Sequence, residues 1–409
     1  MAHNEPQVLI VGGGPAGMMT GLLLARAGVG VLVLEKHADF FRDFRGDTVH
    51  PSTMEILAEL GMLERFLKRP HNRIDAAEVD FNGRGLKIGD LSHLKMPAPF
   101  IAMMPQWDFL DFLRDEARAW PGFALRMNAE ASGVIERDGR VAGVRLADGE
   151  EVRASQLVIF ADGRDSLVRA QHLLPIEDLG APIDVFWCRV PKAPDKVGGL
   201  RGTIRGRRLI VLIDRGDYWQ CAYVIAKGRA DEIRARGIAA FRDDIRAAEA
   251  DLPGLDQELP DWDAVRLLTV SLDRLTRWHK PGLLAIGDAA HAMSPVGGIG
   301  INLAIQDAVA TANILGPALA RGGNPDALLD RVQRRRLLPT RIIQAIQRAA
   351  HENLLGKIVG GGASGKPPLV LRLFDRFPLL RRIPGYFIGH GIGQEHVRNP
   401  AHEMLTRRS

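Results

Sequence analysis

Cysteine is scarce in this 409-residue chain, which contains only Cys188 and Cys221. They lie in apolar surroundings with no Cys-x-x-Cys pattern and no nearby histidine pair, which argues against a disulfide framework or a zinc site. Pairing across adjacent strands is an alternative, but we expect reduced core thiols and no metal. No apolar run approaches the ~18 residues of a membrane span, and the N-terminus does not resemble a signal peptide. We therefore expect a soluble, cytoplasmic protein.

Charge is not spread evenly along the chain. The formal net charge is +5, yet residues 331–409 carry 15 Lys and Arg against 4 Asp and Glu, a net of +11. The preceding 330 residues carry a net of −6. No helix-turn-helix, zinc-finger or aromatic ribonucleoprotein motif accompanies the basic tail, so we expect no nucleic-acid partner. The composition, 46% apolar and 25% charged, is that of a globular protein.

A glycine-rich segment follows the first apolar run. The order is a buried strand, a glycine turn, a helix closed by a glycine cap, and a second buried strand that ends in an acid. These segments are Val8 to Val11, Gly12-Gly13-Gly14-Pro15-Ala16-Gly17, Met18 to Ala27 with Gly28, and Val31 to Leu34 with Glu35.

This order predicts a dinucleotide site. Gly12 makes the tight turn, Gly14 lets the backbone approach a pyrophosphate, and Gly17 lets the helix pack on the strand. The phosphates would lie on the N–H groups at the helix N-terminus, and Glu35 is placed to accept hydrogen bonds from the adenosine ribose. The alternative is a glycine-rich turn with a solvent-exposed Glu35.

Two later strands also end in polar turns. Leu157 to Phe160 runs into Asp162-Gly163, and two turn signals before it predict a small antiparallel meander. Leu283 to Ile286 ends in Gly287-Asp288, which leads through a loop rich in proline and glycine into a helix. An acid at the end of an apolar strand is costly unless something binds it.

The combined order of these motifs resembles the single-component, class A flavoprotein monooxygenases, the family of para-hydroxybenzoate hydroxylase. The resemblance covers about residues 6–350, and the Gly287-Asp288 segment is the part that best distinguishes this family from others. It implies FAD as the cofactor, with Glu35 at the ribose, Arg45 at the pyrophosphate and Gln106 on the flavin chain. It further implies Asp288 at the ribityl hydroxyls and Asp162 in FAD placement. The backbone N–H groups expected at the flavin's N1–C2=O edge are those of Gly298, Ile299, Gly300, Ile301 and Asn302.

Simpler interpretations stay open for several of these residues. Arg45 can pair with a neighbouring aspartate, Gln106 can cap the helix that follows it, and Asp162 can form a turn. His291, although prominent in its motif, is interpreted as structural.

The resemblance implies hydroxylation of a small, aromatic substrate with O2, through a flavin C4a-hydroperoxide. NADH or NADPH would bind transiently, because the chain has no second strand–glycine–helix unit; residues 360–365 are interpreted as a flexible loop. Pro295 would stiffen the loop beside the reacting edge of the flavin. Alternatives are a dehydrogenase or a halogenase on the same fold, the latter disfavoured because no Trp-x-Trp-x-Ile-Pro segment occurs, and a non-catalytic binding protein.

We therefore predict an α/β fold with a Rossmann-like FAD-binding domain on a parallel sheet, an inserted antiparallel substrate domain, and C-terminal helices. The FAD-binding domain would comprise residues 1–70, 101–180 and 276–330. The substrate domain would comprise residues 71–100 and 181–275, and 331–409 would form a basic helical segment. One face of the strand beginning at Tyr218, either that of Gln220 and Ala222 or that of Trp219 and Tyr223, would line the substrate pocket. The alternative is that both faces only pack against neighbouring elements.

The motifs described above do not assign a catalytic acid or base. His50 is our candidate base, because imidazole has a suitable pKa for deprotonating a phenol, although it also fits a helix-capping position. A tyrosine relay has only Tyr218, Tyr223 and Tyr386 as candidates.

The basic tail allows three roles. Apolar residues interleave with arginines between Leu369 and Ile388, so this element would cover the substrate mouth, dock a partner chain, or touch an acidic membrane surface. We favour the cover, which would concentrate anionic reductant near the groove. Both a monomer and a homodimer remain open.

Overall fold

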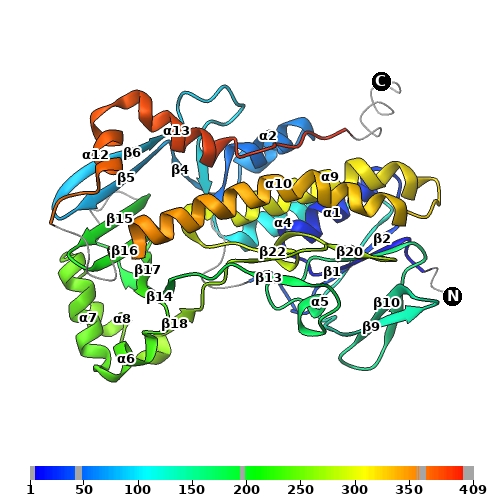
Figure 1. The fold of residues 1–409 in the computed structure, drawn as a ribbon, viewed down its shortest axis with the longest axis horizontal. Helices are drawn as coiled ribbons and strands as arrows, with labels where there is room; N and C mark the ends of the chain where they lie inside the picture. The colour runs from blue at the N-terminus through cyan, green and yellow to red at the C-terminus, as the bar shows by residue number, and fades with distance from the viewer. Residues whose placement is uncertain (1–4, 42–47, 194–198, 357, 359–364, 399–409) are drawn as a thin grey trace.

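The computed structural model describes residues 5–41, 48–193, 199–356, 358 and 365–398. Figure 1 places a sheet with β1 and β2 at one end of the molecule and strands β14 to β18 at the other. The long helices α9 and α10 run between these two ends (Figure 1).

The first sheet has six strands, of which only β20 runs antiparallel to its neighbour. Its central strands β1 and β12 are buried along their whole length, as expected for parallel strands that helices cover on both faces. In sheet order the strands are β20 (His279–Lys280), β21 (Leu283–Ala285), β12 (Leu157–Phe160), β1 (Val8–Val11), β2 (Val31–Leu34) and β8 (Phe123–Arg126).

Four helices cover this sheet and its edge. The first, α1, packs against both α4 and α9, and α9 packs in turn against α10. Among the described residues, the stretch Val296–Ala320 has the length and apolar composition of a membrane span, but 72% of its most apolar window is buried inside the protein. It is a core helix by its packing. The bounds are α1 (Pro15–Arg26), α4 (Gln106–Ala117), α9 (Gly300–Ala320) and α10 (Asp326–Ala350).

A three-stranded antiparallel meander comes after β8 in the chain, and its strands lie in the order β11-β10-β9. Its first turn has Asp138 and Gly139 at φ of 52° and 73°, the positive values that a two-residue hairpin loop requires. The strands are β9 (Ala131–Arg137), β10 (Arg140–Leu146) and β11 (Glu151–Arg153).

The second large sheet has seven strands, and all pairs except β15 with β5 are antiparallel. Cys188 on β14 lies directly opposite Cys221 on β17, and both are free thiols. In order the strands are β18 (Val265–Leu268), β14 (Ile183–Pro191), β17 (Tyr218–Ala226), β16 (Arg208–Asp214), β15 (Leu200–Arg205), β5 (Ala76–Phe81) and β6 (Arg84–Asp90).

The two faces of the seven-stranded sheet pack against different parts of the chain. Trp219 and Tyr223 share a core with Phe241 of α7. Ala222 and Val224 point the other way, into a core against which Val296 packs from the loop before α9. The face of Ala222 therefore looks toward that loop. The helices on the outer face are α6 (Ala230–Ala235), α7 (Gly237–Ala248) and α8 (Leu255–Glu258).

Short elements complete the described chain. They are α2 (Pro51–Glu59), α3 (Leu63–Leu67), β3 (Thr48–Val49), β4 (Asn72–Ile74), β7 (Ile101–Met103), α5 (Leu167–Ala170), β13 (Ile176–Asp178), η1 (Trp262–Ala264), β19 (Asp273–Leu275), η2 (Gly287–Ala289), β22 (His291–Ala292), η3 (Val296–Gly298), the π-helix η4 (His351–Leu355), α12 (Leu369–Arg376) and α13 (Pro378–Gly389). Both α12 and α13 pack on β6. The predicted fold class is confirmed: a parallel sheet with helices, antiparallel sheets and C-terminal helices.

Candidate active site

The glycine turn after β1 is shaped by close backbone contacts. Gly12 has a φ of 103°, and a Cβ on it would lie 2.4 Å from the carbonyl oxygen of Ala161. A Cβ on Gly17 would lie 1.9 Å from the carbonyl oxygen of Gly12. Only glycine fits either position. The turn leads into α1, which begins at Pro15, and the first N–H groups of a helix have no partners within it.

Glu35 lies beside this turn. Its Oε2 accepts a hydrogen bond from the N–H of Gly13 at 3.0 Å, and its Oε1 accepts one from the N–H of His37 at 3.1 Å. The residue is 8% exposed, so the alternative of a solvent-exposed carboxylate does not describe it. The carboxylate thus stands at the carboxyl end of β2, next to the N-terminus of α1.

Gln106 is the first residue of α4 and is half-buried. The N-cap of α4 is Pro105, and no side-chain hydrogen bond caps the helix. The capping alternative for Gln106 is therefore not observed. Arg45 falls within residues 42–47, outside the described residues.

Asp162 and Ser166 form the turn after β12. Asp162 Oδ2 accepts a hydrogen bond from the N–H of Leu167 at 2.8 Å, and Ser166 caps α5. Burial raises the pKa of Asp162, against the hydrogen bonds from Ser166 and Leu167 that lower it. The turn-forming role is therefore real, and it does not exclude a second role toward a ligand.

Two arginines fasten this turn to the Gly287-Asp288 turn. Arg164 Nε lies 3.2 Å from Asp288 Oδ2, and its Nη2 donates to the carbonyl of Met293 at 3.0 Å. Arg169 donates to the carbonyls of Asp288 and Ala289 and pairs with Asp273 at 2.6 Å. Our sequence reasoning missed both arginines, although they follow Asp162-Gly163 at short, fixed spacing.

Glycines in the loop before α9 and at the start of α9 lie close to Thr48 and to Asp288. Gly297 and Gly298 have φ values of 83° and 61°, and a Cβ on Gly298 would lie 2.4 Å from Thr48 Oγ1. Thr48 donates to the carbonyl of Gly298 at 3.0 Å. A Cβ on Gly300 would lie 4.0 Å from Asp288 Oδ1. The positive end of α9 therefore lies beside the Asp288 carboxylate. Pro295 immediately precedes η3.

Asn302, in the first turn of α9, holds His50. Its Oδ1 accepts hydrogen bonds from the N–H of His50 at 3.2 Å and from Thr53 Oγ1 at 2.7 Å. The His50 ring is fully buried, with Nδ1 2.8 Å from the carbonyl of Ile388 on α13. Burial lowers the pKa of His50 to about 4, although the hydrogen bond to Ile388 opposes the shift. The ring is therefore neutral near pH 7 but a weak base, which disfavours His50 as the group that deprotonates a phenol.

We expect the buried His50 to destabilise the protein in acid. Its folded pKa is about 4 and its unfolded pKa about 6.5, so the unfolded chain binds the proton more tightly. The contribution of neutral His50 to the free energy of unfolding is therefore fully present above pH 6.5 and declines as the pH falls toward 4. Between pH 7 and pH 5 the loss is about 2 kcal/mol. In denaturant unfolding, the free energy of unfolding of His50→Gln should fall by about 2 kcal/mol less between pH 7 and pH 5 than that of the wild-type protein. His172→Gln, at an exposed position, should show the same fall as the wild-type protein. Equal acid losses in both variants would contradict the assignment.

Most of this chain matches a known protein family. The family model for the FAD binding domain matches residues 5–348. The chain belongs to this family. It is 32% identical, over 93% of its own length and 91% of the relative's, to a 6-methylpretetramide 4-monooxygenase of Streptomyces rimosus. It is 28% identical to a rifampicin monooxygenase of Streptomyces venezuelae, over 98% and 82% of the two chains. This protein is an FAD-dependent monooxygenase of the single-component class.

The structure of the p-nitrophenol 4-monooxygenase PnpA from Pseudomonas putida has the same fold. The TM-score is 0.70, with 20% identity over 99% of the monooxygenase described here and 97% of PnpA.

The monooxygenase has a buried charge network behind the Gly287-Asp288 turn. Asp307 of α9 is fully buried; its Oδ2 accepts from the N–H of Gly287 at 3.0 Å and from His291 Nε2 at 2.6 Å. Its Oδ1 lies 2.9 Å from Nε of Arg336 on α10, whose side chain is 1% exposed. Burial acts to raise the pKa of Asp307, but His291 and Arg336 outweigh it and hold that pKa below its ordinary value. The structural interpretation of His291 agrees with these contacts.

The Pro295 loop of the monooxygenase is also held from α10 and η4. Ser294 Oγ lies 2.8 Å from Nε2 of the buried His351 and accepts from the N–H of Val296 at 3.2 Å. Gln347 donates to the carbonyls of Ser294 and Val296. Burial lowers the pKa of His351, which favours a neutral ring in the hydrogen bond with Ser294. Sequence reasoning did not find these contacts, because they join segments more than 50 residues apart.

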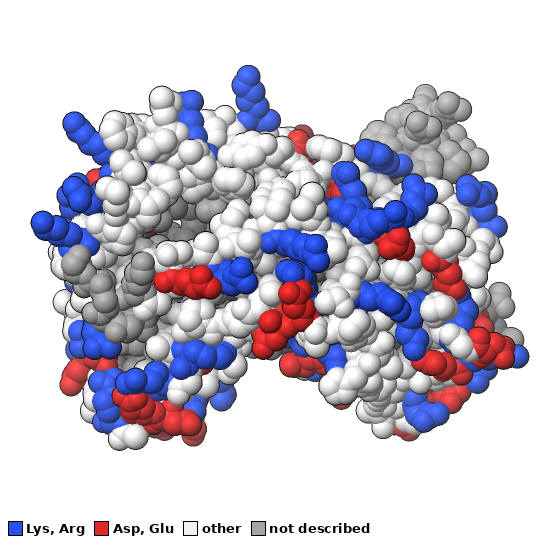
Figure 2. Space-filling model, viewed as in Figure 1, with Lys and Arg blue, Asp and Glu red and all other residues white. Residues whose placement is uncertain are grey.

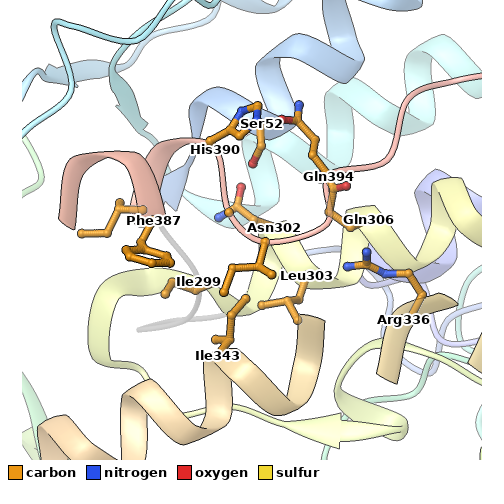
Figure 3. A pocket seen from close by; sticks show the side chains of 13 residues that line it. Ser52, Ile299, Asn302, Leu303, Gln306, Arg336, Ile343, Phe387, His390 and Gln394 are labelled. Atoms are coloured by element: carbon orange, nitrogen blue, oxygen red, sulfur yellow. The ribbon is translucent and has the colours of Figure 1, made fainter. Parts of the chain in front are cut away.

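A small cavity lies between α9 and the chain after α13. Asn302 and Gln306 face His390 and Gln394 across it, and Phe387 stands at one side (Figure 3). Its volume is about 20 Å³, which is enough for about one water molecule. The cavity is therefore too small to receive an aromatic ring.

Proposed function

We propose that this monooxygenase inserts one atom of O2 into a phenolic ring of an aromatic, polyketide-type substrate, with NADPH or NADH as reductant. The observation that carries the proposal is the convergence of the Asp288 turn, the α9 N-terminus and the glycine turn of β1, together with the 32% identity to the 6-methylpretetramide 4-monooxygenase. That relative's name specifies a monooxygenase that acts at position 4 of 6-methylpretetramide.

The residues around this convergence fit FAD. Gly12 and Gly17 leave a turn that any Cβ would fill, and the first N–H groups of α1 suit a pyrophosphate. We assign the ribose to Glu35, the pyrophosphate to Arg45, the flavin chain to Gln106 and the ribityl hydroxyls to Asp288. Bound flavin supplies hydride acceptance from the reductant and the activation of O2.

The N-terminus of α9 contributes electrostatics to this chemistry. Its backbone N–H groups, from Gly298 to Asn302, are proposed to face the N1–C2=O edge of the ring. Negative charge gathers at that edge on reduction, and fixed backbone dipoles stabilise such charge without reorganising. The Arg164 guanidinium, which lies 3.2 Å from Asp288, would hold that carboxylate in place.

We propose that residues 71–100 and 181–275 form the substrate domain. The support is the sheet face that carries Ala222 and Val224, since Val296 of the Pro295 loop packs against their cluster. This favours the face of Tyr218 and Gln220 over that of Trp219 and Tyr223. Burial raises the pKa of Tyr223 to about 12, and its ring packs against α7, so we do not assign it a proton relay.

His50 acts in this proposal as a positioning residue rather than as the base. Its backbone N–H binds Asn302 and its ring binds the carbonyl of Ile388, so it ties the start of α9 to α13. We propose a cytoplasmic enzyme. Cys188 and Cys221, directly opposite each other on paired strands, are free thiols, which is compatible with a reducing compartment.

The experiment is a substrate panel with FAD-reconstituted protein. Tetracyclic phenolic polyketides should stimulate NADPH or NADH oxidation and yield hydroxylated product, and p-nitrophenol should do so less. Stimulation by neither class, with FAD bound, would overturn the substrate proposal. Failure to bind FAD would overturn the site assignment.

Ser294→Ala should reduce coupling between reductant oxidation and hydroxylation. The variant loses the hydrogen bonds to His351 and Val296, which together fix the Pro295 loop, so water would enter beside the flavin more often. We expect the fraction of reductant converted to product to fall several-fold, with FAD affinity changed less than twofold. Hydrogen peroxide and product assays measure this. Ser132→Ala on β9, away from the loop, is the matched control; unchanged coupling in Ser294→Ala would contradict the role.

A further inference from the structure

The two C-terminal helices carry a concentration of exposed apolar side chains. Of the thirteen exposed large apolar residues among those described, eight lie between Leu369 and Phe387. Leu369 and Leu379 are 66% and 70% exposed, and Phe377 and Ile383 about half exposed. We call these exposed residues of α12 and α13 the C-terminal apolar patch. Soluble monomers rarely gather so many apolar side chains at one place unless the surface contacts something.

The exposure does not come from loose packing of these helices. Leu371 of α12 is buried in the core of the seven-stranded sheet. A Cβ on Gly385 of α13 would lie 1.9 Å from the carbonyl oxygen of Asp90, so α13 presses directly on β6. Arg381 Nε donates to the carbonyl of Phe374 at 2.8 Å and joins the two helices. The inner faces are therefore fixed, and the outer face projects from a rigid base.

Positive charge surrounds the patch. Residues 365–390 contain five basic side chains and one acid, Asp375. Arg84 from β6 pairs with Asp375 at 3.0 Å, which neutralises the acid. Figure 2 shows the region over α12 and α13 as largely uncharged surface with Lys and Arg at its edges. The five basic residues are Lys366, Arg372, Arg376, Arg381 and Arg382.

We propose that the C-terminal apolar patch docks the enzyme on an anionic lipid surface. Apolar and aromatic side chains on a helix face, flanked by arginines, are the combination that inserts into the headgroup region of an acidic membrane. A second copy of the chain is disfavoured as the occupant, since a twofold contact would bring two arginine-rich rims together without acids to pair them.

Docking on lipid would place the active site near the membrane. Ile388, at the end of α13, accepts the His50 hydrogen bond, and His50 in turn binds Asn302 of α9. The docked helix is thus connected to the start of α9 by two hydrogen bonds, both made by His50. Apolar aromatic substrates partition into lipid, so a docked enzyme would meet them at a raised local concentration. The lipid proposal does not depend on the substrate class, and either can fail alone.

The test is sedimentation of the full-length, FAD-loaded protein with lipid vesicles. We expect binding to mixed phosphatidylglycerol and phosphatidylcholine vesicles, weakened by salt, and little binding to phosphatidylcholine alone. Removing two exposed charges in Arg376→Ser/Arg382→Ser should weaken binding on the order of 30-fold. Leu379→Ser/Ile383→Ser should also weaken it, whereas Ile176→Ser on β13 and Arg137→Ser on the β9–β10 hairpin should not. The FAD absorbance spectrum in solution should be the same for every variant.

Three outcomes would overturn the proposal. The first is no vesicle binding by a folded, yellow protein. The second is equal binding to neutral and anionic vesicles. The third is a concentration-dependent dimer that Leu379→Ser/Ile383→Ser abolishes while vesicle binding is absent, which would assign the patch to self-association.

Discussion

Arg336→Met is expected to destabilise the folded protein by about 3–5 kcal/mol. The Arg336 guanidinium is 1% exposed and pairs with the fully buried carboxylate of Asp307 at 2.9 Å. Methionine keeps much of the aliphatic volume but removes the guanidinium that pairs with the Asp307 charge. Asp307 also accepts from Gly287, so the turn that holds Asp288 should loosen with it. Denaturant unfolding of the FAD-loaded protein measures the loss.

Arg334→Met is the matched control for this prediction. Arg334 lies two residues before Arg336 on the same helix and forms an ion pair with Asp330 at 2.8 Å, but its side chain is 71% exposed and that of Asp330 53%. An ion pair in water contributes at most about 1 kcal/mol. Similar losses for the two variants, or a loss below about 1 kcal/mol for Arg336→Met, would contradict the importance given to the buried network.

Asp288→Ala is expected to raise the dissociation constant for FAD by about 10- to 100-fold. A hydrogen bond to a charged group contributes about 1.5–3 kcal/mol, and the carboxylate is proposed to accept from the ribityl hydroxyls. The ion pair with Arg164 is about one-third exposed on each side, so its loss should affect stability little. Fluorescence titration of the apoprotein with FAD measures the constant.

Two controls separate ligand binding from turn structure. Asp165→Ala removes an exposed carboxylate from the neighbouring turn and should leave FAD affinity unchanged. Arg164→Gln breaks the ion pair but keeps Asp288, so its effect should be smaller than that of Asp288→Ala. Equal FAD affinity in Asp288→Ala and the wild-type protein would remove Asp288 from the site.

The parts of the fold that local sequence determines could be predicted. Val8 to Val11 is buried along its length because it is apolar at every position, and Gly12 and Gly17 stand where backbone contacts exclude a side chain. The fold class followed from the order of such units. The sequence did not show which face of β17 meets the Pro295 loop, because both faces carry aromatic residues and the choice depends on α7 packing against one of them.

Long-range pairings were not accessible from sequence. Arg336 meets Asp307 only because α10 packs along α9, and the basic residues of α10 look alike in sequence whether they are buried or exposed. The His50 ring forms a hydrogen bond with the carbonyl of Ile388, 338 residues later in the chain. The residues next to His50 in the sequence therefore gave no sign of its lowered pKa. Arg45, in residues 42–47, stays a prediction.

The central claim is that the flavin of this protein delivers oxygen from O2 to an aromatic ring. It is tested most directly by turnover under ¹⁸O2 with FAD-loaded enzyme, reductant and the tetracyclic phenol that best stimulates reductant oxidation. We expect a hydroxylated product whose new oxygen is ¹⁸O, detected by mass spectrometry. A product that carries oxygen from water, or reductant oxidation that yields only hydrogen peroxide with every substrate tried, would contradict it.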